Sequence, residues 1–200
     1  FGIAVGDYDL DGDTDVYLGR GGTSGSFSNV LLENTGGGFL DVTERAGVGR
    51  KAASVGCVFA DVFNRGQLDL YVTTDSWLSG ANSTESQLLG RGHTVEPNIL
   101  YRNAGKGKFS PVVADTLNHK TLSHDAILED LNHDGTIDIY VGVDAIPTGN
   151  KFATSKGGNP VWMRPDGKTW QEVRTRWGVG FESNCVCVPA ADFDNDGDLD

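Results

Sequence analysis

Long apolar runs are missing from this 200-residue sequence, and so is an N-terminal Met. No stretch approaches the roughly 18 to 20 consecutive apolar residues of a membrane-spanning helix, so we expect no membrane span in it. No N-terminal segment has the composition of a signal peptide. Short catalytic motifs such as G-x-S-x-G, H-E-x-x-H and a phosphate-binding glycine loop are also missing, so we expect no catalytic residues and no enzymatic activity.

Cysteine is scarce, with only Cys57, Cys185 and Cys187. Their spacing does not match a zinc site. The odd count leaves two alternatives open: free buried thiols, or disulfides that include a partner outside this stretch of chain.

Basic residues are few: the sequence has 16 Lys and Arg against 28 Asp and Glu, which gives a net charge of −12. This balance disfavours nucleic acid and anionic membranes as partners. It does not by itself indicate a basic partner, since 13 of the 28 acidic residues lie in three short segments.

The first of these segments is residues 7–15, DYDLDGDTD. Aspartates at positions 1, 3, 5 and 9 can supply the six to eight oxygens that Ca²⁺ takes, and the residue at position 7 can add its backbone carbonyl. Gly12, at position 6, permits the sharp turn around the ion. The segment predicts a calcium-binding loop.

The same pattern recurs at residues 130–138 (DLNHDGTID) and 192–200 (DFDNDGDLD). An EF-hand is excluded, because that motif needs a Glu at position 12 and a following helix, whereas short β-branched and aromatic runs follow here. We therefore expect calcium-binding turns between β-strands. The predicted ligands are Asp7, Asp9, Asp11, Asp13 and Asp15 in the first loop, Asp130, Asn132, Asp134, Thr136 and Asp138 in the next, and Asp192, Asp194, Asp196, Asp198 and Asp200 in the last.

A degenerate copy lies between them at residues 61–69, DVFNRGQLD. Phe63 and Arg65 replace the second and third ligands. We predict that no metal binds there, and that the Arg65 guanidinium pairs with Asp61 or Asp69 in place of the ion.

A second signature separates the loops: it begins at Asn29, Asn98 and Asn159 and reads as strand, glycine turn, strand. From this Asn to the next loop the distance is 32, 32 and 33 residues, whereas from loop to Asn it is 22, 37 and 29. The constant part suits a packed scaffold, and the variable connection suits a surface loop that carries specificity.

Each unit thus has four strands, in the first copy at about residues 2–5, 16–18, 30–33 and 39–43. Repeated four-stranded antiparallel units predict an all-β fold of β-propeller blades. A β-sandwich is the alternative, but it has no reason to repeat its sequence. Antiparallel alternation places the metal loops and glycine turns at one rim of every blade and the variable connections at the opposite rim.

All 200 residues are expected to belong to one propeller domain. The blade repeats span about 1–51, 52–120 and 121–181, and the next begins at 182–200. Because both ends cut through a repeat, we expect a fragment of a longer propeller. Phe39, Phe109 and Trp170, at matching places, are expected to pack between neighbouring blades.

The loop pattern resembles the FG-GAP/VCBS repeat of integrin α-subunit propellers. The second signature, as in residues 29–48 (NVLLENTGGGFLDVTERAGV), is similar to the repeats of cartilage acidic protein and bacterial UnbV-type (ASPIC) proteins. This resemblance covers essentially the whole chain. It implies a propeller of about seven blades, calcium as the cofactor, a secreted, cell-surface or otherwise exported location, and a role in adhesion or binding.

We therefore expect a non-catalytic, calcium-stabilised extracellular propeller. It would bind a protein or glycan through the rim of variable connections. Two alternatives stay open. One is a carbohydrate-binding lectin that uses Trp77 or Trp162, and the other is an enzyme of the polysaccharide lyase type.

Overall fold

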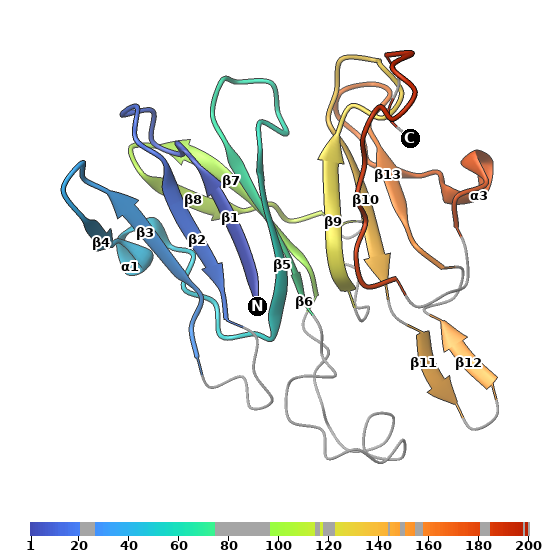
Figure 1. Ribbon diagram of the computed structural model, residues 1–200, viewed down its shortest axis with the longest axis horizontal. Helices are drawn as coiled ribbons and strands as arrows, with labels where there is room; N and C mark the ends of the chain where they lie inside the picture. The colour runs from blue at the N-terminus through green and yellow to red at the C-terminus, as the bar shows by residue number, and fades with distance from the viewer. Residues whose placement is uncertain are drawn as a thin grey trace.

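The computed structural model describes residues 1–20, 27–74, 97–114, 117, 123–143, 145–148, 151–154, 158–180, 185–197 and 199. Within these ranges the chain forms three four-stranded antiparallel sheets and one two-stranded sheet (Figure 1). The all-β prediction and the four-stranded unit are confirmed.

The first sheet contains β1 (Gly2–Gly6), β2 (Asp15–Gly19), β3 (Val30–Asn34) and β4 (Phe39–Asp41), paired in chain order. Alternate residues of β2 are fully buried, as expected for a strand whose successive side chains point to opposite faces. The predicted strand positions are therefore correct to within one or two residues.

The second and third sheets repeat this plan. The second contains β5 (Ser54–Ala60), β6 (Asp69–Thr74), β7 (Ile99–Gly105) and β8 (Lys108–Pro111). The third contains β9 (Ser123–Glu129), β10 (Asp138–Val143), β13 (Val161–Met163) and β14 (Gln171–Glu172). A separate hairpin, β11 (Ala145–Thr148) with β12 (Lys151–Thr154), is inserted between β10 and β13.

The sheets stack face to face, with β1 next to β5 and β5 next to β9. One apolar core lies between the first two sheets and another between the second and third. Phe109 of the second sheet stacks on Tyr8, which follows β1, with ring centroids 5.6 Å apart. Trp170, at the matching place directly before β14, is buried in the second core, which also contains Val62. The predicted packing of these two aromatic residues between sheets is confirmed.

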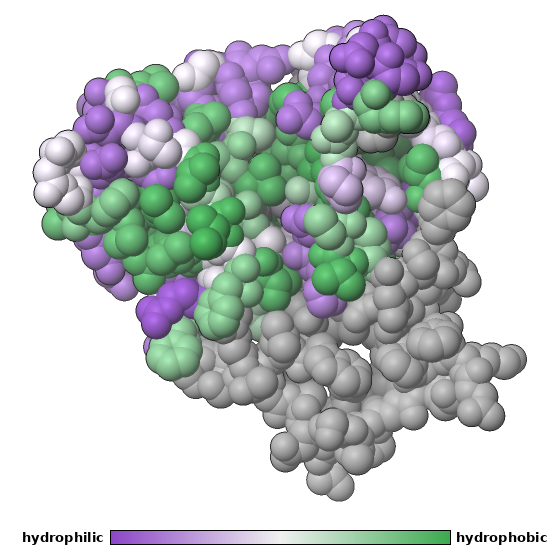
Figure 2. All heavy atoms as spheres, in the orientation of Figure 1, coloured by the Kyte–Doolittle hydropathy of each residue, from purple (hydrophilic) through white to green (hydrophobic). Residues whose placement is uncertain are grey.

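Phe39 is the exception, because 57% of it is exposed. The first sheet has no preceding sheet among the described residues, and apolar atoms gather on its face in Figure 2. Its exposed apolar residues include Ile3 and Val5 of β1. Their counterparts in β9, Ala126 and Leu128, are buried in the core shared with the second sheet. A further blade would cover this face of the first sheet in the same way.

The predicted placement of the turns is confirmed. The turns from β1 to β2, from β5 to β6 and from β9 to β10 lie along the upper edge in Figure 1. Because neighbouring strands are antiparallel, the β3–β4 and β7–β8 turns lie at this rim as well. Closure of the sheets into a ring of blades stays a prediction.

Two short helices replace parts that were expected to be strand or simple connection. The fourth strand of the first sheet ends at Asp41, two residues before the predicted end, and α1 (Thr43–Ala46) follows. The Asp41 carboxylate accepts a hydrogen bond from the Thr43 N–H at 3.0 Å, and Gly47 ends the turn in the left-handed conformation. The equivalent α3 (Arg174–Trp177) follows β14.

An asparagine clamp joins neighbouring sheets at the opposite end of the blades from the metal loops. The Asn98 amide donates to the hydroxyls of Tyr71 in its own sheet (3.3 Å) and Ser123 in the next sheet (2.9 Å), and its carbonyl accepts from the Thr74 N–H (2.9 Å). Asn29 makes the same contacts with Tyr17 and Ser54. Asn29 and Asn98 therefore bridge neighbouring blades, whereas the hydrogen bonds of Asn159 to Val143 (3.0 Å) and Tyr140 (3.2 Å) lie within the third sheet.

All three cysteines are free thiols. Cys57 is buried between the first two sheets, as one of the two alternatives requires. Cys185 is half-buried and Cys187 is exposed, so the alternative of free buried thiols does not hold for Cys187.

Replacing Asn98 with Leu should lower the free energy of unfolding by about 3 kcal/mol, because it leaves buried hydrogen-bonding groups without partners. Ser123→Ala, which removes one of those partners, should cost about 1 kcal/mol. Denaturant unfolding followed by circular dichroism measures both. Ser110→Ala, on an exposed residue of β8, is the control. An Asn98→Leu protein as stable as this control would contradict the clamp.

Candidate metal sites

The first aspartate of each loop closes the turn through two backbone hydrogen bonds. The Asp7 carboxylate accepts from the N–H groups of Asp11 (3.1 Å) and Gly12 (3.0 Å). The same pair of bonds, to positions 5 and 6, recurs at Asp61, Asp130 and Asp192 at 2.6–3.1 Å. All four loops, including the degenerate one, therefore have the same backbone turn.

Two positions of every loop adopt a left-handed backbone. At position 6 the φ angles are +95° for Gly12, +69° for Gly66, +83° for Gly135 and +96° for Gly197. At position 4 non-glycine residues adopt φ of +51° to +66°, namely Leu10, Asn64, His133 and Asn195. The predicted need for glycine at position 6 is confirmed, and the second left-handed position was not predicted.

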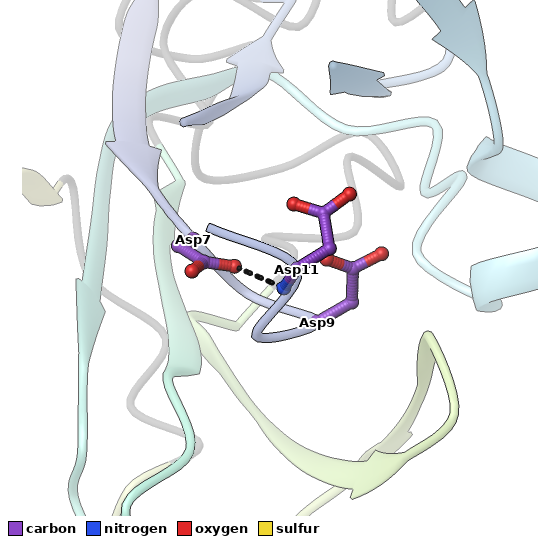
Figure 3. A group of neighbouring side chains, drawn as sticks. All are labelled: Asp7, Asp9 and Asp11. Carbon is purple, nitrogen blue, oxygen red and sulfur yellow. Dashed lines mark hydrogen bonds between the residues drawn. The ribbon is translucent and has the colours of Figure 1, made fainter. Parts of the chain in front are cut away.

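In the first loop, ligand oxygens of Asp7, Asp9 and Asp11 lie within 4.8 Å of one another. Figure 3 shows the side chains of Asp9 and Asp11 next to each other, and the Asp7 carboxylate turned toward the Asp11 N–H. Asp9 Oδ1 is buried, and none of the described groups donates a hydrogen bond to it. Burial, followed by the charges of Asp11, Asp15 and Glu33, raises the pKa of Asp9. This crowded set of anionic oxygens fits a hard divalent cation such as Ca²⁺.

The aspartate at position 9 begins the next strand and is completely buried in the first three loops. Asp15 Oδ1 accepts from the Asn34 N–H at 2.8 Å, and Oδ2 accepts from the Tyr8 N–H at 3.1 Å. Asp138 Oδ2 accepts from the Leu131 N–H at 3.1 Å, but Oδ1 is buried without a hydrogen-bond donor among the described residues. Burial raises the pKa of Asp138 to about 7. A cation at this loop would stabilise the charged carboxylate.

In the third loop, the carboxylate at position 5 is hydrogen-bonded to other side chains of the same loop. Asp134 accepts from the Thr136 N–H (2.9 Å) and hydroxyl and from the Asn132 amide (3.0 Å), and the Thr136 hydroxyl bond in particular lowers the pKa of Asp134. Asp130 closes the turn as Asp7 does. The predicted ligands of this loop thus lie in one turn, but part of their hydrogen-bonding capacity is used within it.

Position 7 was predicted to act through its backbone carbonyl. Asp13 and Thr136 each donate their backbone N–H to the aspartate at position 5, at 2.9 Å. Their carbonyl oxygens as ligands stay a prediction.

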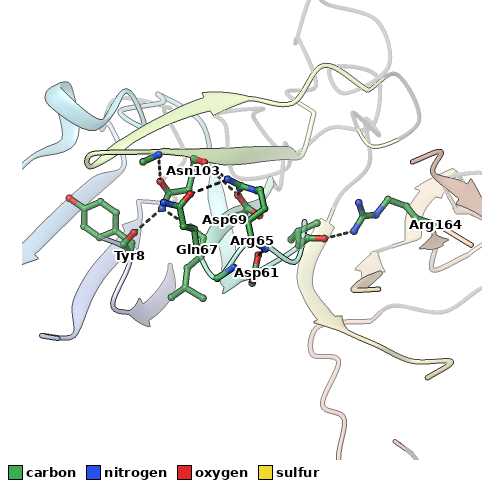
Figure 4. Close-up of polar contacts among 11 residues, drawn as sticks. Tyr8, Asp61, Arg65, Gln67, Asp69, Asn103 and Arg164 are labelled. Carbon is green, nitrogen blue, oxygen red and sulfur yellow. Dashed lines mark hydrogen bonds and ion pairs between the residues drawn. The ribbon is translucent and has the colours of Figure 1, made fainter. Parts of the chain in front are cut away.

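The degenerate loop contains the predicted ion pair. Arg65 Nη2 lies 2.6 Å from Asp69 Oδ1, and Nη1 donates to the Asn103 carbonyl at 2.9 Å (Figure 4). Three guanidinium groups lie close to the Phe63 ring, at 5.1–5.6 Å from its centre: those of Arg65, Arg102 and Arg164. Arginine side chains therefore supply positive charge at the loop that lacks two ligand carboxylates.

The fourth loop brings Asp192, Asp194 and Asp196 within 4.8 Å of one another at an exposed place. Asp198 and Asp200 lie outside the described residues. The strand expected before this loop is absent from the described residues 185–197. In each of the three described four-stranded sheets, the strand before the loop pairs with the strand after it. Cys185 still donates its N–H to the Val143 carbonyl at 3.1 Å, so the segment starts beside the third sheet.

Sequence reasoning missed the contacts that the second signature makes with the loops. Its sixth residue reaches the previous blade: Asn103 Nδ2 donates to the Tyr8 carbonyl at 2.8 Å, and Arg164 Nη2 donates to the Val62 carbonyl. Tyr8 and Val62 are both position 2 of their loops. The recurrent sixth position was visible as Asn34, Asn103 and Arg164, but only the stacking of the sheets identifies its partner.

Gly12→Ala should lower the free energy of unfolding by about 1 kcal/mol, because an L-residue with a Cβ is strained at positive φ. Gly37→Ala is the matched control: an added Cβ meets nothing within 4 Å at either glycine, but only Gly12 has a positive φ. Thermal unfolding of the two variants compares them directly. Equal stabilities would show that the left-handed turn is not required.

The double substitution Phe63→Asp with Arg65→Asp should create one additional calcium site, because it restores carboxylates at positions 3 and 5 of a turn already in the right conformation. Calorimetric titration should give a stoichiometry higher by one. Phe63→Asp alone keeps the Arg65 cation and should add none. An unchanged stoichiometry in a folded double variant would count against the cation-replacement interpretation.

Comparison with known proteins gives one family match. Residues 7–72 match the family described as FG-GAP-like repeat, a range that runs from the first ligand of loop one into β6. No curated protein matches the chain. The matched range contains the first loop, the second signature and the degenerate loop, and its sheet plan recurs in the third sheet. The chain therefore carries an FG-GAP-like repeat, folded as four-stranded antiparallel sheets of the β-propeller-blade type.

Proposed function

We propose that this protein is a calcium-stabilised, non-catalytic β-propeller that binds a protein or glycan partner outside the cell. The proposal is supported most directly by the first loop, where Asp7, Asp9 and Asp11 converge and the buried Oδ1 of Asp9 has no donor among the described residues. A divalent cation bound there would offset the repulsion between these carboxylates.

Calcium in these loops would be structural. Each of the first three loops joins the first two strands of a blade. The second residue of the first two loops packs against the next sheet: Tyr8 stacks on Phe109, and Val62 lies in the core that contains Trp170. An ion that fixes the loop would therefore also stabilise the contact between blades. Extracellular calcium modules commonly have dissociation constants of about 10⁻⁴ to 10⁻³ M, which agrees with an exported location. None of the helices in the described ranges is long and apolar enough to cross a membrane.

FG-GAP-like repeats build interaction domains, and the rim opposite the metal loops is the binding surface that we propose. Its connections differ in length between blades, as the spacing of the signatures indicates. Trp162, considered as a lectin contact, is only 1% exposed in the core between the second and third sheets. It cannot stack on a sugar without unfolding that core. Trp77 lies outside the described residues.

Removal of calcium should lower the melting temperature. With a dissociation constant of about 10⁻⁴ M and about 2 mM calcium, each site adds about 1.8 kcal/mol, so three sites shift the midpoint by about 10–20 °C. Scanning calorimetry in calcium and in EDTA measures this shift, and an equal concentration of magnesium tests the ion. The same protein applied to glycan and protein arrays should bind only in calcium. A melting temperature insensitive to EDTA would contradict the proposal.

A further inference from the structure

The fifth residue of each second signature faces position 3 of the loop in its own blade. In the second blade the Arg102 guanidinium lies 5.2 Å from the ring centre of Phe63. In the third blade the Met163 sulfur accepts a hydrogen bond from the Asn132 amide at 3.5 Å. One place in the blade therefore contacts the central ligand position of the loop.

In the first blade this place is occupied by Glu33. Its carboxylate accepts a hydrogen bond from the Tyr8 hydroxyl at 2.9 Å, and Tyr8 lies between the predicted ligands Asp7 and Asp9. The charge of Glu33 acts on Asp9, the predicted ligand at position 3. Glu33 thus adds a sixth carboxylate to the five of loop one.

The position of Glu33 is fixed by two neighbours. The Tyr8 hydroxyl, which donates to the Glu33 carboxylate, is the first of them. Arg45 forms an ion pair with Glu33, but half of the Arg45 side chain is exposed, against 16% for Glu33. Solvent screens the Arg45 guanidinium more than it screens Glu33, so Arg45 offsets only part of the effect of the Glu33 charge on the loop.

The third blade has the opposite arrangement. Met163 is neutral and Arg164, the next residue, is only 4% exposed. Asp138 and Asp134 are among the carboxylates whose charges act on the Arg164 guanidinium. Loop three therefore has three carboxylates, an uncharged residue at the fifth position of its second signature, and a buried cation nearby.

We propose that the fifth residue of the second signature sets the calcium affinity of its own blade, so that Glu33 makes loop one a tight site and Met163, with Arg164, leaves loop three a weak one. The proposal rests on the calcium function proposed above. The affinity of oxygen-ligand sites for Ca²⁺ is tuned by the number of ligand charges, and Coulomb interactions are strong where solvent is partly excluded. As the calcium concentration rises, loop one therefore fills before loop three, and calcium stabilises the contact between the first two blades at the lower concentration.

Single-loop proteins test this. An arginine at position 5, as in loop two, disables the other loops: Asp134→Arg with Asp196→Arg leaves loop one, and Asp11→Arg with Asp196→Arg leaves loop three. Calorimetric titration with calcium chloride of the full 200-residue chain should give a dissociation constant about tenfold lower for loop one. Glu33→Gln in the loop-one protein should weaken binding about tenfold. Glu44→Gln, the same charge change on α1 of the same blade, should change it less than about twofold.

Met163→Glu in the loop-three protein is the reciprocal test and should tighten binding, with Met163→Gln as the neutral control of similar shape. Circular dichroism confirms that each variant is folded. Equal affinities of the two loops, or a folded Glu33→Gln protein with unchanged affinity, would overturn this inference while leaving calcium binding intact. Failure of both single-loop proteins and of the unmodified chain to bind calcium would overturn the proposed function as well.

Discussion

Two backbone N–H groups that converge on one carboxylate determine the shape of every loop in this chain. Asp7, Asp61, Asp130 and Asp192 all accept from positions 5 and 6 of their loops. These bonds and the left-handed residues at positions 4 and 6 bend the chain back toward its own sheet. The aspartate at position 9 is therefore buried at the start of the next strand in each four-stranded sheet. The turn is thus determined by the backbone, and positions 3 and 5 are free to differ between blades.

This division explains how one blade can dispense with the carboxylates of its neighbours. In loop two the turn is kept while Arg65 pairs with Asp69 and Phe63 lies among guanidinium groups. A buried carboxylate needs a compensating charge, which an arginine side chain or a bound cation can provide. We propose that two residues of the loop, and the residue that faces them from the third strand of the blade, determine which of the two is used.

Side-chain hydrogen bonds join neighbouring blades at both ends, in addition to the backbone hydrogen bonds within each sheet. At the loop end, Asn103 and Arg164 reach carbonyl groups of the preceding blade. At the other end, Asn29 and Asn98 bridge to a serine of the following blade. The apolar cores lie between these two sets of polar contacts. These contacts tie each loop to the next sheet, and through them the metal binding that we propose would stabilise the packing of the blades.

Much of the fold could be predicted from the sequence, because repetition aligns weak local signals. The strands, their order, the placement of the turns and the pairing of Arg65 with Asp69 all follow from one repeated pattern. The helical turn at α1 could not, since it depends on a hydrogen bond from the Thr43 N–H to the Asp41 side chain. The burial of Phe39 was predicted wrongly because it requires a neighbouring sheet. The role of Glu33 could not be predicted because it depends on contact with a loop distant in sequence.

The occupancy of the loops is the most direct test of this account. Anomalous diffraction from crystals of the protein grown in calcium locates bound ions independently of stability or affinity. The account predicts calcium peaks among the oxygens of Asp7, Asp9 and Asp11 and of Asp130, Asp134 and Asp138, and none beside Arg65. Loops without such peaks, or a peak in the degenerate loop, would contradict it.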